Sequence, residues 1–327
     1  MARINHRLRV WGWVTRRQVS AARMSEAEIA ALQTRTVPAN AVTNWIFGKV
    51  PAGVTLTGRT VPGPAGDIPV RVYQPPGASL AEGAARPLVV YFHGGGFVFG
   101  NLDLGNWICG TVADRVGAVV VSVDYRLAPK HRFPAAVEDA YAGLAWAAEN
   151  AAGLGADGPV GVMGESAGAT LAAVACLIAK ERGGPALAHQ ALIYPAADMT
   201  GALNVPASQS NAPFLSAGEM AAYNRLYLGP DGDAAHPWAS PLLAADHQGL
   251  PPALIQVGEH DPLRDSGERY AATLRAAGVP VKLTEYPGMP HGFVNFPGLS
   301  RGAGQAMAEV CAEQTAALAA PQRESAA

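Results

Sequence analysis

Short apolar segments alternate with longer amphipathic segments along most of the chain. The apolar segments are rich in Val, Ile and Leu and are bounded by Gly and Pro, which is typical of buried strands, and stretches of helical periodicity separate them in the second half. We expect strands near 54–60, 69–74, 87–92, 118–123, 159–163, 189–194, 252–257 and 280–286, and helices near 134–150, 169–182, 263–277 and 302–320. This alternation predicts an α/β protein with a mostly parallel, doubly wound sheet of eight strands.

Composition narrows the function classes. The chain has 327 residues, of which 49% are hydrophobic and 15% charged, so it can bury a large core, and a single α/β domain with an insertion is the simplest interpretation. A net charge of −2 gives no general attraction to nucleic acid or anionic lipid. Because Cys109, Cys176 and Cys311 are odd in number and widely spaced, they indicate neither a disulfide framework nor a zinc site. We expect no metal, no cofactor and no nucleic-acid partner.

The first residues carry charge without a targeting pattern. Residues 1–18 contain five arginines and no following apolar region with a cleavage signal, and no apolar run in the chain is long enough to cross a membrane. The sequence therefore predicts a cytoplasmic protein with no integral membrane association. Trp11 and Trp13 lie among those arginines, which leaves a membrane-surface helix open as an alternative.

The candidate chemistry centres on Ser166, which lies in a Gly-x-Ser-x-Gly motif between a predicted strand and a predicted helix. A sharp turn from strand to helix strains the serine backbone, and side chains at positions 164 and 168 would collide with it, so Gly164 and Gly168 are expected there. The hydroxyl would then stand above the carboxyl edge of the sheet, with the N–H of Ala167 pointing at a developing oxyanion. The motif predicts a nucleophile at Ser166, although an ordinary glycine-rich turn would show the same five residues.

A glycine-rich loop follows the predicted strand near 87–92. It reads His93-Gly94-Gly95-Gly96-Phe97, and its glycines let the backbone approach a ligand closely, so its N–H groups could complete an oxyanion hole. A phosphate-binding loop is the competing interpretation. It is disfavoured because the sequence lacks both Gly-x-Gly-x-x-Gly and Gly-Lys-Ser/Thr, and because no helical pattern begins directly after the glycines.

Two further candidates follow later predicted strands. Asp261 lies just past the strand near 252–257, where a fixed carboxylate can orient an imidazole, and His291 follows the strand near 280–286 and precedes a glycine. The chain order Ser166, Asp261, His291 is the one expected of α/β-hydrolases rather than of other serine-hydrolase folds. His93 and His260 stay open as alternative bases.

Five ordered motifs resemble the hormone-sensitive-lipase family of carboxylesterases, also called bacterial family IV. These are His93-Gly94-Gly95-Gly96, Tyr125-Arg126-Leu127-Ala128-Pro129, Gly164-Glu165-Ser166-Ala167-Gly168, Asp261-Pro262-Leu263-Arg264-Asp265 and His291-Gly292-Phe293. The resemblance extends from about residue 50 to the C-terminal helix. Two positions depart from the family pattern without touching a catalytic atom: Glu165 stands where Asp is commoner, and Ala169 stands where Gly is usual.

The resemblance implies roles for particular residues. It implies the α/β-hydrolase fold with a helical cap and a catalytic triad of Ser166, His291 and Asp261, with Asp261 rather than Asp265 as the acid. It also implies oxyanion-hole donors at Gly95, Gly96 and Ala167. Homodimers through the last strand are common in the family, so a homodimer stays open here.

The resemblance also indicates a domain organisation. Residues 1–50 are expected to form an N-terminal cap segment, 51–200 and 237–327 the two parts of the hydrolase core, and 201–236 a cap insertion that interrupts the alternation of strands and helices. Within the insertion, several apolar residues are candidates for a substrate pocket: Phe214, Leu215, Met220, Tyr223 and Tyr227. Apolar residues at helical spacing usually face a core, so packing is the preferred interpretation of each.

Together these features predict a serine carboxylic-ester hydrolase that acts through an acyl-enzyme on small-molecule esters with short to medium acyl chains. Hydrolysis of an amide or peptide bond by the same triad stays open, because the chemistry is shared. A non-catalytic small-molecule receptor of the same fold is a further alternative. The receptors of this kind that resemble these esterases lack the triad histidine, whereas His291 is present here.

Overall fold

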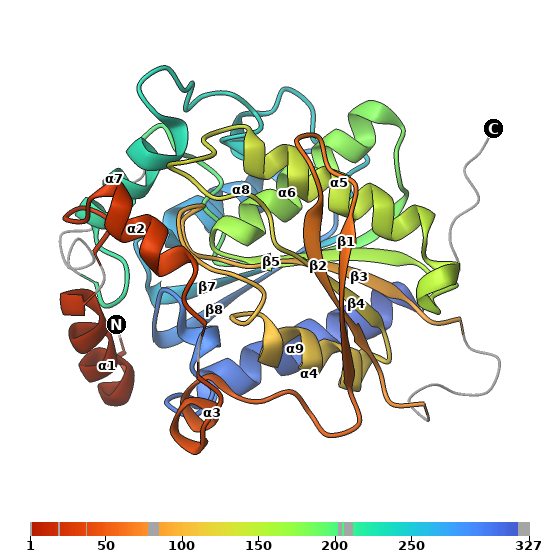
Figure 1. Ribbon diagram of the computed structural model, residues 1–327. Coiled ribbons are helices and arrows are strands. Elements are labelled where there is room, and N and C mark those ends of the chain that lie inside the picture. The colour runs from red at the N-terminus through yellow and green to blue at the C-terminus, as the bar shows by residue number, and fades with distance from the viewer. Residues whose placement is uncertain are drawn as a thin grey trace.

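The computed structural model describes residues 2–18, 20–36, 38–77, 85–201, 205 and 212–319. Within them, eight strands form one sheet in the order β1-β2-β4-β3-β5-β6-β7-β8 (Figure 1). The strands are β1 (Thr55–Val61), β2 (Ile68–Gln74), β3 (Leu88–Phe92), β4 (Val119–Val123), β5 (Val160–Glu165), β6 (Leu187–Ile193), β7 (Ala253–His260) and β8 (Val281–Pro290). Strand β2 pairs antiparallel with β1 and β4, and the other pairings are parallel. The predicted mostly parallel sheet of eight strands is confirmed.

Helices cover both faces of this sheet. Figure 1 shows α5 (Ala135–Glu149), α6 (Ala167–Arg182) and α8 (Arg264–Ala276) on one face, and α4 (Asn106–Val116) and α9 (Arg301–Leu318) on the other. The remaining α-helices of the described residues lie outside these two layers: α1 (His6–Gln18), α2 (Glu26–Gln33), α3 (Ala41–Phe47) and α7 (Ala217–Leu228). The arrangement is doubly wound, as the sequence predicted.

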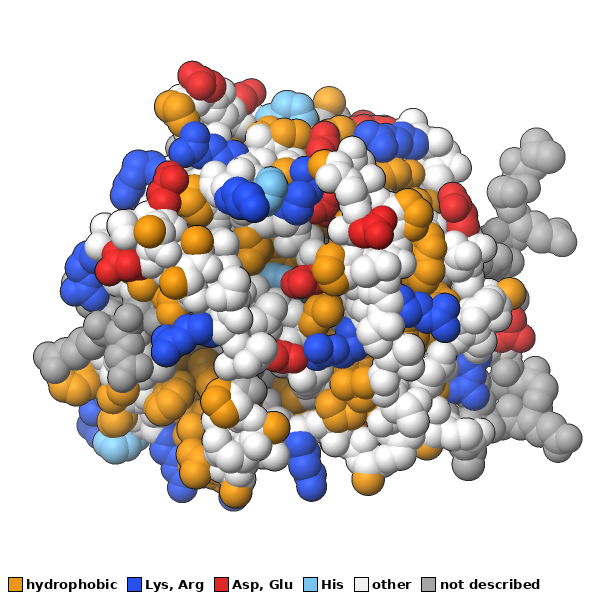
Figure 2. Space-filling model, in the orientation of Figure 1, with side chains coloured by type: hydrophobic (Ala, Val, Ile, Leu, Met, Phe, Trp, Pro, Cys, Tyr) orange, Lys and Arg blue, Asp and Glu red, His pale blue; other side chains and the backbone are white. Residues whose placement is uncertain are grey.

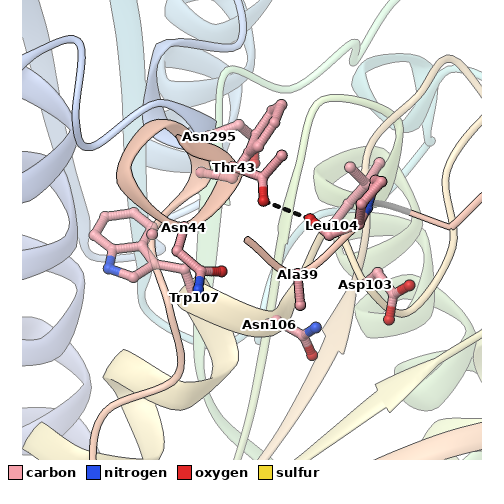
Figure 3. A pocket seen from close by; sticks show the side chains of 11 residues that line it. Ala39, Thr43, Asn44, Asp103, Leu104, Asn106, Trp107 and Asn295 are labelled. Carbon is pink, nitrogen blue, oxygen red and sulfur yellow. Dashed lines mark hydrogen bonds between the residues drawn. The ribbon is translucent and has the colours of Figure 1, made fainter. Parts of the chain in front are cut away.

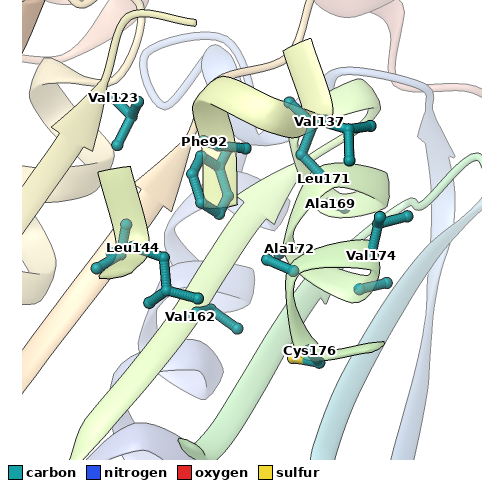
Figure 4. Packing of buried hydrophobic residues seen from close by; sticks show 14 of the residues in the cluster. Phe92, Val123, Val137, Leu144, Val162, Ala169, Leu171, Ala172, Val174 and Cys176 are labelled. Carbon is teal, nitrogen blue, oxygen red and sulfur yellow. The ribbon is translucent and has the colours of Figure 1, made fainter. Parts of the chain in front are cut away.

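The central strands are apolar on both sides because helices cover both sides. In β3, Leu88, Val90 and Phe92 belong to the core under α5 and α6, whereas Val89 and Tyr91 belong to the core under α4 and α9. Figure 4 shows the first of these cores, where side chains of α5 and α6 pack over the sheet. Each fully buried large apolar side chain contributes about 1.5–3 kcal/mol of transfer free energy. The two cores therefore stabilise the sheet on both faces.

Helix α4 was not predicted from the sequence. It contains Gly110 among β-branched residues, and its N-cap residue, Gly105, makes no side-chain capping hydrogen bond, so its local helical signal is weak. A Cβ atom on Gly110 would lie 2.9 Å from Pro51 Cδ, so the glycine permits close packing of the preceding segment. Ile108 and Val112 are buried in the same core as α9. Tertiary burial, rather than propensity, forms this helix.

Strand pairing brings the candidate residues to one edge of the sheet. Strands β7 and β8 are longer than predicted and pair as far as His260 and Pro290, so Asp261 and His291 each follow directly after this pair. Strands β3 and β5 are also parallel neighbours, so the glycine loop and the Ser166 turn leave the sheet side by side. Ligand sites of open α/β sheets lie outside the carboxyl ends of strands, which is where these segments lie.

Parts of several predicted regions fall outside the described residues. Residues 202–204 and 206–211 of the insertion 201–236 and residue 320 of the predicted C-terminal helix are among them. Across the part of the chain that the structure describes, no helix combines the length and apolar character that a membrane span requires. Strand β8 lies at one edge of the sheet, and the homodimer that the resemblance leaves open stays a prediction.

Candidate active site

Ser166 occupies a strained turn between β5 and α6. Its backbone has φ 54° and ψ −122°, a region that residues with a side chain rarely adopt, and its N–H donates to the carbonyl of Ile193 at 2.9 Å. A Cβ atom on Gly164 would lie 2.2 Å from the Gly168 carbonyl oxygen, and one on Gly168 would lie 2.0 Å from the Phe92 carbonyl oxygen. Backbone cannot yield at such distances, so this turn requires glycine at both positions.

Ser166, His291 and Asp261 form one hydrogen-bonded line. His291 Nε2 lies 2.8 Å from Ser166 Oγ, and His291 Nδ1 lies 2.7 Å from Asp261 Oδ2. The other carboxylate oxygen of Asp261 accepts the Leu263 N–H at 2.8 Å. Asp261 is fully buried, whereas Ser166 and His291 retain 9% and 8% exposure. The structure therefore brings together all three residues of the predicted triad, with the serine on the open side.

The alternative bases, His93 and His260, have hydrogen-bond partners other than Ser166. His93 is fully buried and stacks on Tyr125, its Nδ1 lies 2.8 Å from the Gly94 carbonyl oxygen, and burial lowers its pKa to about 4. His260 Nε2 lies 2.7 Å from the Ala2 carbonyl oxygen. Both histidines therefore have surroundings that suit structural roles.

Main-chain donors lie beside the serine. Gly95, Gly96 and Ala167 line the same cavity as Ser166 and His291, and within the described residues no acceptor is hydrogen-bonded to their N–H groups. Gly95 and Gly96 have φ values of 115° and 64°, which favour glycine. Three such donors next to a hydroxyl are what a developing oxyanion needs.

Glu165 contacts the glycine loop. Gly94 donates its N–H to Glu165 Oε1 at 2.6 Å, and a Cβ atom on Gly94 would lie 2.4 Å from Glu165 Oε2. Glu165 is 3% exposed, and burial raises the pKa of its carboxyl group. The sequence identified Glu165 only as a departure from the family pattern, whereas the structure gives it a contact that holds the loop carrying Gly95 and Gly96.

The cavity above Ser166 has a volume of about 260 Å³ and is partly lined by the insertion. Four of the candidates named from the sequence line it: Phe214, Leu215, Met220 and Tyr223. Tyr227 does not, because its ring stacks on Phe97 at 3.9 Å between centroids and is buried. Packing alone therefore describes Tyr227, whereas Phe214 and Tyr223 both pack against a core and line the cavity.

Other lining residues were not anticipated from the sequence. They include Phe47 at the end of α3, Asn295 in the segment after His291, and Asp198. Burial raises the pKa of Asp198, but hydrogen bonds from Thr200 and Arg269 outweigh it, so the net pKa lies below the ordinary value. Asp198 follows β6 by a few residues, so the strand-end rule that singled out Asp261 would also have found it.

A second cavity adjoins the first. It has a volume of about 300 Å³, lies between α3 and the start of α4, and shares Phe47, Leu104 and Asn295 with the cavity above Ser166 (Figure 3). Figure 3 shows that polar side chains, among them Thr43 and Asn44, contribute to its wall. Among the described residues, no group of three His, Cys, Asp or Glu side chains is arranged to hold a metal ion.

Comparisons with known proteins show the family of the chain. Residues 89–295 match a family profile described as alpha/beta hydrolase fold. The chain is 44% identical over 249 residues to Esterase LipI of Mycobacterium tuberculosis, covering 75% of this chain and 77% of that protein. It is 36% identical over 231 residues to Ethyl acetate hydrolase of Pseudomonas putida, covering 70% and 72%. It superposes on the hyperthermophilic esterase from the archaeon Pyrobaculum calidifontis with a TM-score of 0.80 at 36% identity, covering 97% and 100%. The chain therefore belongs to the hormone-sensitive-lipase-like family of the α/β-hydrolase fold.

Proposed function

We propose that the protein is a serine carboxylesterase in which Ser166 is the nucleophile, His291 the general base and Asp261 the residue that orients the base. The observation that carries this proposal is the line of two short hydrogen bonds from Asp261 through His291 to Ser166. The relatives that share the fold are named as esterases and carboxylesterases, which supports ester hydrolysis as the reaction class.

The first half of the reaction forms an acyl-enzyme. His291 Nε2 takes the Ser166 hydroxyl proton as Oγ attacks the ester carbonyl carbon, and the buried Asp261 carboxylate stabilises the imidazolium that forms. The carbonyl oxygen becomes negative and accepts hydrogen bonds from Gly95, Gly96 and Ala167. The carbon–oxygen bond to the alcohol then breaks, and His291 returns the proton to the departing alkoxide oxygen.

The second half repeats these steps with water. His291 takes a proton from the water molecule as the water oxygen attacks the acyl carbon, and the Ser166 oxygen leaves with that proton. The products are one alcohol and one carboxylic acid, and the enzyme returns to its starting state. No cofactor enters either half.

The cavity supports esters with short to medium acyl chains. Its volume of about 260 Å³ lies below the ~300–1,000 Å³ of typical small-molecule sites, and Leu215, Met220 and Tyr223 are among the residues that line it. One similar protein carries the name Ethyl acetate hydrolase, which fits a small acyl group. We assign residues 1–50 and 201–236 to a cap, because Phe47 and Met220 from these segments line the cavity.

The nucleophile is tested with a fluorophosphonate probe and a panel of p-nitrophenyl esters of increasing chain length. Ser166→Ala is expected to abolish both labelling and turnover while keeping the fold, because it removes one oxygen at the cavity wall. Ser122→Ala is the matched control, because Ser122 is a buried serine on β4 that does not line the cavity. Full turnover by Ser166→Ala would disprove the assignment.

Two alternatives are separated in the same experiments. Comparing p-nitrophenyl butyrate with p-nitrobutyranilide keeps the acyl group and tests ester against amide hydrolysis, and comparable rates would favour the amide hydrolase. A non-catalytic small-molecule receptor predicts no labelling by the probe. His291→Asn is expected to lower kcat by several orders of magnitude, and an unchanged rate would move the base to His93 or His260.

A further inference from the structure

The N-terminal segment concentrates positive charge. The first 25 residues contain six arginines and no Asp or Glu, although the whole chain has a net charge of −2, so the rest of the chain is net acidic. Within α1 and just before it, Arg3, Arg7 and Arg9 are exposed, and no carboxylate of the described residues lies within ion-pair distance of them. Exposed arginines without a carboxylate partner, as at these three positions, are a feature of surfaces that bind anions.

The same region also exposes large apolar side chains. Of the six large hydrophobic side chains that the described residues expose, four lie on α1 and α3: Val10, Trp13, Val42 and Trp45. Their exposed fractions lie between 48% and 63%. Figure 2 shows hydrophobic and basic side chains interspersed at the lower left, over the place of α1 and α3 in Figure 1.

Helix α1 has an outer and an inner face. His6, Arg9, Val10 and Trp13 follow helical spacing and are exposed, whereas Leu8 is buried. The inner face packs on the protein so closely that a Cβ atom on Gly12 would lie 2.7 Å from Pro213 Cβ. Packing of the inner face of α1 on the protein therefore leaves the face with basic and apolar side chains exposed to solvent.

The helices that carry this surface also contact residues of the catalytic cavity. Trp11 of α1 makes an edge contact with Phe47 of α3, at 6.5 Å between ring centroids. The absent side chain of Gly12 leaves room for Phe214, which stacks on Phe296. Phe47, Phe214 and Phe296 all line the cavity above Ser166. Helices α1 and α3 therefore lie beside the candidate active site, with their exposed face on the outer side.

We propose that the outer face of α1 and the exposed end of α3 bind an anionic lipid surface. Arg7, Arg9 and Lys49 would lie at the headgroups, and Trp13 and Trp45 would enter the boundary between headgroups and acyl chains. A nucleic acid or an acidic protein would match the arginines, but neither would require the aliphatic Val10 and Val42 on the same surface. Binding at this place would bring the cavity close to lipid-dissolved esters, and this last consequence alone rests on the proposed function.

The test is co-sedimentation of the full chain with vesicles of phosphatidylcholine alone and with vesicles of equal parts phosphatidylcholine and phosphatidylglycerol. The protein is expected to bind the anionic vesicles and to be released by high salt, because the charge term is screened. Arg7→Gln with Arg9→Gln is expected to weaken binding about 25-fold, since each basic residue near an anionic surface contributes about fivefold. Trp13→Ser is expected to weaken binding to both kinds of vesicle.

Matched controls lie on other elements. Arg59→Gln with Arg115→Gln removes two exposed arginines from β1 and α4, and Leu56→Ser removes an exposed apolar side chain from β1. These variants are expected to bind like the unmodified protein, and every variant is expected to keep its unfolding temperature and its hydrolysis of a dissolved ester. No sedimentation with anionic vesicles, or equal binding by the α1 variants and the controls, would overturn the proposal. Retention of double-stranded DNA or polyglutamate without vesicle binding would also overturn it. Because the assay needs no hydrolysis, its failure would leave the esterase proposal untouched.

Discussion

Replacing Glu165 tests whether the glycine loop must be held in place for catalysis. Glu165 Oε1 accepts the Gly94 N–H at 2.6 Å in a site that is 3% exposed. Glu165→Ala removes this acceptor and leaves a buried N–H unsatisfied, whereas Glu165→Gln keeps a carbonyl oxygen at the same place. The pair of variants therefore separates the hydrogen bond from the negative charge.

The expected magnitude follows from that hydrogen bond. A hydrogen bond to a charged group contributes about 1.5–3 kcal/mol, and a factor of ten in rate corresponds to about 1.4 kcal/mol. Gly94 directly precedes Gly95 and Gly96, so a shift of the loop moves the proposed oxyanion donors. We expect kcat of Glu165→Ala to fall about 10- to 150-fold with little change in KM, because the donors act on charge that develops in the transition state. Glu165→Gln is expected to retain kcat within about threefold.

The assay is steady-state hydrolysis of one p-nitrophenyl ester by the wild type and both variants. Wild-type kcat in Glu165→Ala, or equal losses in both variants, would refute the proposed role of the hydrogen bond. A raised KM with unchanged kcat would instead indicate that Glu165 contacts the substrate.

Stability gives an independent readout of the same substitution. Because burial raises the pKa of Glu165, the folded protein binds this proton more tightly than the unfolded chain does. That contribution to stability is complete below the ordinary pKa of glutamate and is lost as the pH rises through the raised value. Glutamine has no such dependence, so the unfolding free energy of Glu165→Gln relative to wild type should increase from acid toward neutral pH. Denaturant unfolding at several pH values measures this, and a difference that does not change with pH would contradict it.

Three further predictions follow from the geometry. Asp261→Asn should lower kcat by about 10⁴-fold with the fold intact, because the amide no longer fixes the imidazole tautomer; a loss below tenfold in hydrolysis assays would exclude Asp261 as the acid. Gly168→Ala should lower the unfolding temperature strongly or prevent folding, because the added Cβ would lie 2.0 Å from the Phe92 carbonyl oxygen. Gly304→Ala is the control: this glycine of α9 has open space around its Cβ position, so alanine should stabilise the fold by about 0.5–1 kcal/mol. Equal unfolding temperatures of the two variants would contradict this. Met220→Trp should lower the ratio of octanoate to acetate hydrolysis, since Met220 lines the cavity, and an unchanged ratio would place the acyl chain elsewhere.

The sequence predicted the sheet well because its strands carry local signals. The strand near 87–92 is apolar at every position because both of its faces are covered, and β3 occupies Leu88–Phe92. Helix α4 was missed because Gly110 and the uncapped start at Gly105 weaken its local pattern, and burial against α9 compensates only in the folded protein. The ends of β7 and β8 were placed too early, since Gly258 and Gly288 interrupt the apolar pattern while pairing continues to Pro290.

The residues of the candidate site also fall into those that the sequence identified and those that it did not. Ser166 and the glycine loop were identified from the sequence because strained turns and close backbone approach require glycines at fixed offsets. Phe47 and Asn295 were not identified from the sequence, because no local pattern indicates which residues of distant segments will line one cavity. Tyr227 was grouped with the cavity candidates, but stacking on Phe97 turns it away.

The sequence by itself determined the strands, the turn at Ser166, the glycine loop and the order of Ser166, Asp261 and His291, since each depends on neighbouring residues and on backbone sterics. Only the tertiary structure decided the hydrogen bonds that join these three side chains, the contact of Glu165 with Gly94 and the outward face of α1. The physical reason is that backbone conformation is set over a few residues, whereas a site depends on distances between segments far apart in the chain. Those distances are fixed only when strand pairing and the packing of both cores are complete.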